Sequence, residues 1–503
     1  MDFFQLGLFL RKSEENMKTK KTNLVLVTIA IFVATFMTAI EGTIVSTAMP
    51  TIIGSLNGIS MMNWVFSIYL LTSSIATPIY GKLSDRMGRK PIFIVGLVIF
   101  LIGSTLAGLS DSMMTLILAR ALQGIGAGAI QPMTFTMIAD IYPFEKRAKV
   151  LGLNGSAWGI ASIIAPLLGG YIVQHLSWHW IFFINIPVGL ITLLLVIFFF
   201  HETPRTAKAP IDYFGAATLS VVLLALMISA QGIGTANLLI NGFWIIVAIV
   251  AAWLFVRSEA HAKDPLIPLA LFKNRLFLGV NLVAALISGV LIGFEVYIPM
   301  WMQGILGLPA SMGGFAVTPS SVMWIFGSFL AGRLIVEKSA PKILTWSLLI
   351  IGIGIGVLGL LPIGTPFWTF LLVAAFLGTG FGITITTTTV TAQNAVSEDQ
   401  VGLATSLNTL SRTIGQTIMM SSFGVIQNTL FAQGIKHDSR LKMAMLNKLI
   451  NPETAKQIAS ELIPKLRDIL LTAMHGVYWV GVVLVVIALA INFWSGRSAK
   501  DKA

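Results

Sequence analysis

The sequence predicts an all-α polytopic membrane protein. Its composition carries the first half of that prediction, because 56% of the residues are hydrophobic and only 11% are charged. A soluble domain carries about 25% charged residues, so this chain has too few to cover a surface in water. The second half is a series of long apolar runs that short polar segments separate.

Each apolar run is long enough to form a membrane-spanning helix. A helix needs about 20 apolar residues to cross the hydrocarbon core, and lipid offers no partners to free backbone groups, so the runs must be helical. The predicted spans are 24–48, 62–80, 91–109, 113–138, 149–173, 180–200, 213–232, 240–257, 277–301, 312–332, 343–362, 367–390, 403–427 and 474–495. The sequence therefore predicts fourteen spans.

The positions of Lys and Arg predict which side of the membrane each connection faces. Most of the 33 basic residues fall in alternate connections, as cytoplasmic loops require, and those in the outer loops are confined to one segment, 428–473. The protein is therefore expected in the cytoplasmic membrane, with both termini on the cytoplasmic side. The basic residues behind the net charge of +12 therefore serve as a signal for membrane topology. They are not a nucleic-acid binding surface, so no nucleic-acid partner is predicted.

The outer segment 428–473 has helical spacing of Leu, Ile and Met, with a break at Asn451 and Pro452. This pattern predicts a pair of short surface helices that cap the outer mouth. A surface that binds a partner or lipid is the alternative.

Several classes of site are excluded by what the sequence lacks. There is no cysteine, which excludes disulfides and thiolate sites. No His, Asp and Glu cluster has metal-ligand spacing, and no P-loop or nucleophile elbow is present. We expect no enzyme, no metal, no cofactor and no direct coupling to ATP.

The connection after the second span carries a recognisable motif. Residues 81–90 read GKLSDRMGRK, which resembles the corresponding loop of the major facilitator superfamily. Glycine permits a tight turn, and Asp85 can cap a helix and pair with arginine. The resemblance implies a gating role for Gly81, Asp85, Arg86, Gly88 and Arg89.

Three further stretches extend the resemblance along the chain. Residues 120–128, RALQGIGAG, are similar to the fourth-span motif of that family, and residues 157–170 are similar to its antiporter motif. The latter gives Pro166, Gly169 and Gly170 as gating candidates, although Ala165 stands where glycine is usual. Residues 41–50, EGTIVSTAMP, resemble the first-span signature of drug:proton antiporters, with glutamate where aspartate is more common.

Residues 178–189, WHWIFFINIPVG, closely resemble the signature of the fourteen-span drug:proton antiporters. The resemblance implies the fold of that family, two six-helix bundles with two inserted helices between them. The expected parts are a cytoplasmic extension 1–23, an N-terminal bundle 24–200, a linker with the inserted helices 201–276, a C-terminal bundle 277–495 and a cytoplasmic tail 496–503.

The resemblance also implies a function, proton-coupled export of hydrophobic and cationic drugs by alternating access. The implied partners are the lipid bilayer, small amphipathic drugs and protons; the energy source is the proton gradient, and we expect a monomer. The alternative on the same fold is an exporter or flippase of an endogenous amphiphile, such as a lipid-linked precursor or a siderophore.

Charged side chains inside a span are costly, so they are candidates for functional sites. At a rise of about 1.5 Å per residue, Glu41 and Arg120 both lie in the outer half of the membrane. We expect them to interact, with Glu41, Arg120 and the inner Asp140 as proton-coupling residues. A purely structural ion pair is the alternative.

Glu295 lies at nearly the depth of Glu41, beside Phe294 and Tyr297. A carboxylate among aromatic rings suits an organic cation, so these residues and Glu41 are substrate-binding candidates; a protonated, hydrogen-bonded carboxyl is the alternative for Glu295. The other substrate candidates, which could equally hold helices together, are Gln123, Gln131, Trp158 and Asn408. Arg412 is a gating candidate that either reaches the inner surface or pairs with an acid.

Overall fold

The computed structural model describes residues 22–202, 213–232, 238–262, 269–397, 400–436 and 438–500. Within these ranges the chain is helical, with short 3₁₀ and π segments, and the structure contains no strand there. The predicted fold class is confirmed. The side chains of Asp85 and Arg86 lie outside the described part of the chain, so the gating roles expected for them have no structural description.

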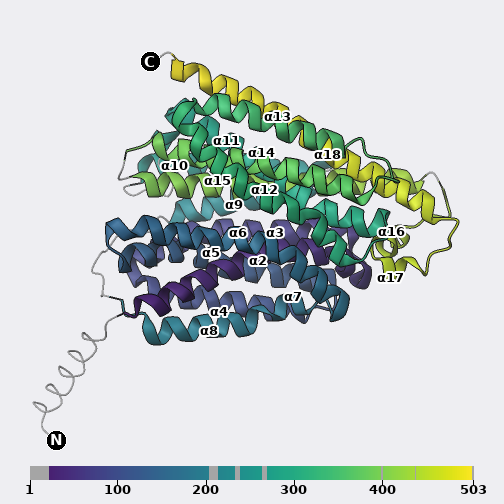
Figure 1. The fold of residues 1–503 in the computed structure, drawn as a ribbon, viewed down its shortest axis with the longest axis horizontal. Helices are drawn as coiled ribbons and strands as arrows, with labels where there is room; N and C mark the ends of the chain where they lie inside the picture. Colours follow the sequence, from purple (N-terminus) through teal and green to yellow (C-terminus); the bar gives the residue numbers. More distant parts are fainter. Residues whose placement is uncertain are drawn as a thin grey trace, which may run out of the picture.

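The first six predicted spans form one bundle (Figure 1, purple to blue). Its helices are α2 (Leu24–Leu56), α3 (Met62–Met87), α4 (Arg89–Gly108), α5 (Met113–Ile141), α6 (Phe144–His175) and the consecutive pair α7 (Trp180–Phe183) and α8 (Asn185–Phe199). The short helix η1 (Ile59–Met61) joins α2 to α3.

The last six predicted spans form the second bundle (Figure 1, teal to yellow). Its helices are α11 (Arg275–Met300), α12 (Ala310–Glu337), α13 (Ala340–Leu358), α14 (Phe367–Asn394), α15 (Val401–Lys436) and α18 (Ile463–Lys500). The helix η2 (Leu269–Lys273) precedes this bundle, and a π-helical turn, η3 (Trp301–Ile305), extends α11.

The two middle helices, α9 (Tyr213–Gly232) and α10 (Leu238–His261), pack against each other. Helix α9 also contacts α3 of the first bundle and α15 of the second. Its buried Leu219, Leu223 and Met227 belong to one apolar cluster with Leu71 of α3, and Ile414 of α15 packs against that cluster. The inserted pair therefore lies against both bundles on one flank of the molecule.

Glycines let the helices of the first bundle approach closely. A Cβ at Gly124 would lie 2.5 Å from the backbone oxygen of Tyr69, and one at Gly126 would lie 2.3 Å from the backbone nitrogen of Phe100. Both contacts are shorter than van der Waals packing allows, so only glycine fits. The run from Gly124 to Gly128 thus holds α5 between α3 and α4, which sets the position of Arg120.

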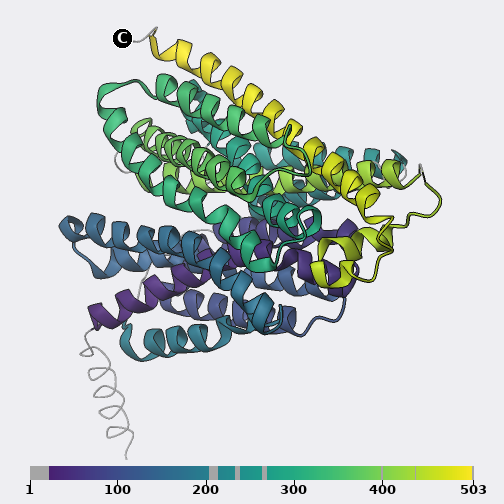
Figure 2. The same cartoon turned by 45° about the vertical axis from the view of Figure 1, so that its right-hand side comes forward.

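The two bundles meet at one end of the molecule and diverge toward the other (Figure 2). We call the end that bears Gly88 and Asp140 the inner end, because the charge pattern predicts that it faces the cytoplasm. The opposite end is the outer end. Thr22 lines a pocket with Asp140 at the inner end, and the C-terminal end of α18 lies at the same end of the molecule (Figure 1).

Close contacts join the bundles in their outer halves. A Cβ at Gly314 of α12 would lie 2.0 Å from the backbone oxygen of Pro166 in α6, and a Cβ at Gly170 would lie 2.5 Å from the Cα of Ser311. Two of the three gating candidates around Pro166 therefore lie at the α6–α12 contact. The third, Gly169, packs against Ile44 of α2.

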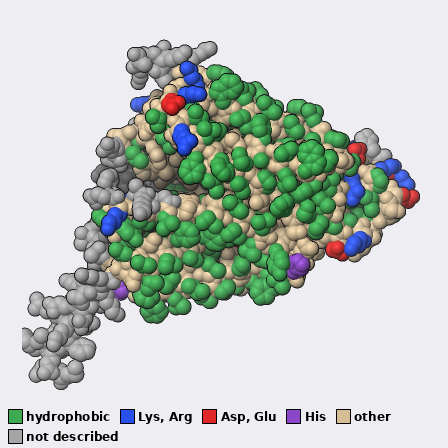
Figure 3. Space-filling view, in the orientation of Figure 1, with side chains coloured by type: hydrophobic (Ala, Val, Ile, Leu, Met, Phe, Trp, Pro, Cys, Tyr) green, Lys and Arg blue, Asp and Glu red, His purple; other side chains and the backbone are tan. Residues whose placement is uncertain are grey.

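Twelve helices in the described ranges are long and apolar enough to cross a membrane. The two predicted spans outside that set coincide with α9, whose described apolar part is the shorter Phe214–Ser229, and with α15, which is rich in Ser, Thr, Asn and Gln. The surface agrees, since a broad apolar band separates the charged groups at the two ends (Figure 3). The chain is a multi-pass membrane protein; the count of fourteen crossings and the side of each terminus stay predictions.

The outer segment contains two short helices, α16 (Met443–Ile450) and α17 (Pro452–Ala455), with Asn451 as the cap of α17. The break predicted at Asn451 and Pro452 is confirmed. The helices that flank this segment continue into it, since α15 ends at Lys436 and α18 begins at Ile463. Hydropathy marks only the part of a helix that lies in lipid, and both helices continue beyond it as polar turns.

Candidate functional site: a charged cavity between two helical bundles

A buried ion pair joins α2 to α5. The Arg120 guanidinium donates to Oε1 of Glu41, and the exposed fractions of the two residues are 1% and 0%. Depth along the two helices predicted that these residues would interact, and the structure contains the pair. Burying two charges is costly unless further hydrogen bonds satisfy them, so the surroundings of the pair matter.

Each member of the pair has additional polar partners. Asn185 at the start of α8 donates to Oε2 of Glu41 at 2.7 Å and to Ser104 Oγ of α4 at 2.9 Å. Gln123 accepts from Arg120 at 2.7 Å, and the Arg120 Cζ lies 3.9 Å from the centroid of the Tyr69 ring. Five helices of the first bundle thus meet at one closed polar network, which explains how the charges are tolerated.

A cavity of about 470 Å³ lies between the two bundles. Helices α2, α3, α5 and α6 line it from one side, and α11, α12, α14 and α15 line it from the other. Three of the predicted substrate residues, Gln131, Trp158 and Glu295, line this cavity. Ligand pockets for drug-sized molecules fall in this range of volumes.

The charged side chains that line the cavity, among the described residues, are Arg120, Glu295 and Arg412. Glu295 and Arg412 interact electrostatically, and Arg412 Nε lies 3.4 Å from Ser288 Oγ of α11. The basic residue that shares the cavity with Glu295 comes from α15 and not from its own helix, α11. A close crossing brings it there: a Cβ at Gly415 would lie 2.0 Å from the backbone oxygen of Ala285.

The other five predicted substrate residues do not line the cavity. Glu41 and Gln123 belong to the closed network around Arg120 and are fully buried. Phe294 packs against Phe381 in the core of the second bundle, and Asn408 bonds to Asn281 and Thr389. For Asn408 the structure favours the alternative that it holds helices together.

Tyr297 lies in the outer contact between the bundles. Its hydroxyl is 3.2 Å from Asn63 Oδ1 of α3 and 3.2 Å from Gln427 Oε1 of α15, and Asn63 donates to Gln427 at 3.1 Å. All three residues are buried. The position of Tyr297 along its span could not predict this contact, because the contact depends on which face of α11 turns toward α3.

Sequence reasoning missed several residues that line the cavity, including Phe66, Tyr69 and Trp324. Phe66, Tyr69 and Ser73 recur at intervals of three and four residues in the second span, which places them on one face of a helix. That spacing was the available signal. It was inconclusive because aromatic residues at helical spacing are also typical of cores.

The inner end of the first bundle contains a second polar cluster. Arg89 Nε lies 3.5 Å from Asp140 Oδ2, and the Arg89 guanidinium also donates to Ser84 Oγ at 2.8 Å. Gly88, at φ +94°, lies between α3 and α4. Asp140 and Arg89 thus join α5 to the loop whose motif pointed to a gate.

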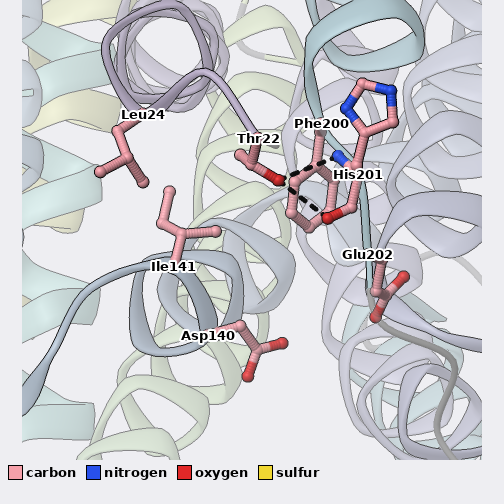
Figure 4. A pocket seen from close by; sticks show the side chains of 7 residues that line it. All are labelled: Thr22, Leu24, Asp140, Ile141, Phe200, His201 and Glu202. Carbon is pink, nitrogen blue, oxygen red and sulfur yellow. Dashed lines mark hydrogen bonds between the residues drawn. The ribbon is translucent and has the colours of Figure 1, made fainter. Parts of the chain in front are cut away.

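Glu202 was not predicted, yet it holds the start of α4. Its carboxylate accepts from the backbone nitrogens of Arg89 at 2.7 Å and of Lys90 at 3.0 Å, which satisfies free N–H groups at a helix start. A pocket of about 200 Å³ lies beside it, where Thr22 Oγ1 donates to the backbone oxygen of His201 at 2.8 Å (Figure 4). The chain just before α2 and just after α8 is thereby held beside the start of α4.

No group of three or more His, Cys, Asp or Glu side chains that could hold a metal ion occurs in the part of the chain that the structure describes. The site consists instead of an ion pair closed inside one bundle, an amphipathic cavity between two bundles, and a charged cluster at the inner end. These features are typical of a transporter.

The chain belongs to the Major Facilitator Superfamily, which it matches over residues 31–420. It is 32% identical to the multidrug transporter protein MdtP of Bacillus subtilis (strain 168), over 98% of this chain and 97% of that protein. It is 35% identical to the multidrug efflux pump SdrM of Staphylococcus aureus (strain N315), over 82% of this chain and 92% of that protein.

Solved structures with the same fold are more distant in sequence. A bacterial homolog of the human lysosomal transporter Spinster, in an inward-facing and unoccupied conformation, aligns with a TM-score of 0.67 and 17% identity. That alignment covers 94% of this chain and 96% of the other. An auto-inhibited peptide transporter of the POT family aligns with a TM-score of 0.65 and 15% identity.

Proposed function

We propose that this protein exports hydrophobic and cationic drugs across the cytoplasmic membrane in exchange for protons, by alternating access. The similarity to multidrug transporters supports the drug class. The observation that carries the proposal is the cavity between the bundles, with a carboxylate and aromatic rings on its walls. In this structure the outer contacts are formed and the bundles diverge at the inner end, as expected for a state that accepts substrate from the cytoplasm.

The Glu41–Arg120 pair gives exchange a physical basis. Arg120 lines the cavity, and Glu41 lies behind it. Protonation of Glu41 removes the negative partner of Arg120 and leaves an unbalanced positive charge at the cavity wall. That charge repels a cationic substrate, so the proton and the substrate oppose each other's binding, and this opposition is reciprocal.

Arg89 and Asp140 act at the inner end of the first bundle. Their ion pair fastens the α3–α4 loop to α5 within the first bundle, so it keeps the inner ends of these helices together as one body. We therefore assign Asp140 to the gate and to the response of the bundle to protonation, and Glu41 and Arg120 to proton coupling.

The test is transport by the purified protein in liposomes with an imposed proton gradient. Ethidium and tetraphenylphosphonium should accumulate only when the gradient is present, and Glu41→Gln should abolish gradient-driven accumulation because it cannot release a proton. Glu337→Gln, at an exposed inner position of α12, is the matched control and should transport normally. If the gradient drives none of these compounds, export of an endogenous amphiphile becomes the better proposal.

A further inference from the structure

The cavity presents charges of both signs to a bound molecule. Arg120 is already engaged by Glu41, Gln123 and the Tyr69 ring, and its exposed fraction is only 1%. Glu295 and Arg412 differ, since both are partly exposed and line the cavity. The pair that a ligand can reach is therefore one carboxylate and one guanidinium.

Both groups of this pair have unused hydrogen-bonding capacity. In the described part of the chain, the guanidinium of Arg412 has one side-chain hydrogen bond, a long one to Ser288 at 3.4 Å, although it carries five N–H donors. Glu295 accepts no hydrogen bond from the described residues, although its oxygens can accept several. Each group can therefore gain short bonds to a ligand.

The walls beside the pair are apolar and aromatic. Trp158 of α6 is 43% exposed, and Trp324 of α12 and Phe66 of α3 also line the cavity. A flat aromatic ligand can pack against such rings. A ligand with only a positive charge would bind Glu295 but leave the Arg412 charge facing it, which costs Coulomb energy in a partly buried site.

We propose that this cavity selects zwitterionic aromatic amphiphiles, whose cationic group binds Glu295 and whose anionic group binds Arg412. The inference rests on the proposed export function and deepens it, because it names the substrate class of the same cavity. Each charged group of the ligand then faces a protein group of opposite charge on the cavity wall. Neither protein charge is then left uncompensated, whereas a simple cation leaves Arg412 without a partner.

The experiment compares two dyes of nearly equal shape. Rhodamine B carries a cationic ring system and a carboxylate, and its ethyl ester carries the cation alone. Binding to the purified protein, measured by fluorescence anisotropy at pH 7, should favour rhodamine B by about tenfold, the size expected for one charged hydrogen bond.

Variants of the pair assign each group. Arg412→Gln should weaken rhodamine B about tenfold and should strengthen the ester, because the positive charge that faces the ester is gone. Glu295→Gln should weaken both dyes. Arg412→Lys keeps the positive charge and should retain part of the preference, which covers the case in which the Gln variant fails to fold. Tighter binding of the ester by the unmodified protein, or equal weakening of both dyes by Arg412→Gln, would overturn the inference.

This outcome is separable from the test of export itself. Gradient-driven transport of ethidium without a preference for rhodamine B over its ester rejects the zwitterion inference alone. Absence of gradient-driven transport for every compound rejects the export proposal.

Discussion

At the scale of single residues, the site depends on a few side chains that form hydrogen bonds to otherwise unpaired groups, and on one glycine whose backbone makes room for such a contact. Asn185 satisfies the second oxygen of Glu41, and Glu202 satisfies two backbone nitrogens at the start of α4. Gly88 makes the second arrangement possible, because its backbone has φ +94° and ψ 161°. This region of backbone conformation is essentially restricted to glycine.

Gly88→Ala should destabilise the inner end of the first bundle. The new Cβ would lie 2.7 Å from Oε2 of Glu202, and the strained backbone alone costs about 1–3 kcal/mol. We expect a lower melting temperature for the purified protein in detergent and weaker transport. Gly332→Ala on α12 is the control, since a Cβ there meets no atom within 4 Å. If the two variants have the same melting temperature, neither the backbone conformation of Gly88 nor its contact with Glu202 is important for stability.

At the scale of elements, the sequence predicted the helices well and their contacts poorly. All fourteen predicted spans coincide with helices, because a run of apolar residues in lipid has no other stable conformation. The Glu41–Arg120 pair followed from depth, since two costly charges at one level are expected to meet. That Arg412 lines the same cavity as Glu295, and that Tyr297 lies in the outer contact, did not follow, because both depend on how α11 rotates against α15 and α3.

Glu202 shows the same limit outside the membrane. It follows the sixth span and reads as the start of a linker, so nothing in the sequence separates it from an ordinary solvated carboxylate. Its role depends on the spatial approach of α8 and α4, where Lys90 Nζ also donates to the backbone oxygen of Phe200 at 2.6 Å. Such contacts are fixed by tertiary packing and leave no local pattern.

The outer segment is held at Asp438, which lies between the ends of α15 and α18. Arg440 donates to both of its oxygens, at 3.1 and 2.9 Å, and Lys465 of α18 donates at 2.9 Å. The hydrogen bonds from Arg440 and then Lys465 hold the pKa of Asp438 below its ordinary value of 3.8. The carboxylate therefore stabilises the folded segment at pH above about 4, and this stabilisation is lost as the pH falls through the lower folded pKa.

We expect amide hydrogen exchange over 438–462, corrected for intrinsic rates, to speed up as the pH is lowered below about 4. Asp438→Asn should exchange faster than the unmodified protein at pH 6 and should lose this acid response. Glu453→Gln serves as the control, because its pair with Lys456 is largely exposed and such pairs contribute little. An acid response that persists in Asp438→Asn would assign it to another group.

At the scale of the whole molecule, the two bundles are joined on the outer side by polar contacts that an outward-facing state must break. Besides the Asn63, Tyr297 and Gln427 cluster, Gln303 donates to the backbone oxygen of Thr47 at 3.2 Å. Asn447 of α16 accepts from the backbone nitrogen of Ile59 at 2.9 Å. Most of these groups are buried and hydrogen-bonded, so each broken contact must be replaced by water as the outer side opens.

A covalent link across this contact should therefore stop transport. Asn428 of α15 donates to the backbone oxygen of Ser60 in η1 at 3.0 Å, so the two residues lie close enough to test as a cysteine pair. The chain has no cysteine of its own, and Ser60→Cys with Asn428→Cys can form only the intended disulfide within one chain. Oxidation should abolish gradient-driven transport and a reductant should restore it, while each single variant stays active under both conditions. Full transport by the completely oxidised pair would mean that the outer contact does not open during the cycle, and alternating access between these bundles would have to be abandoned.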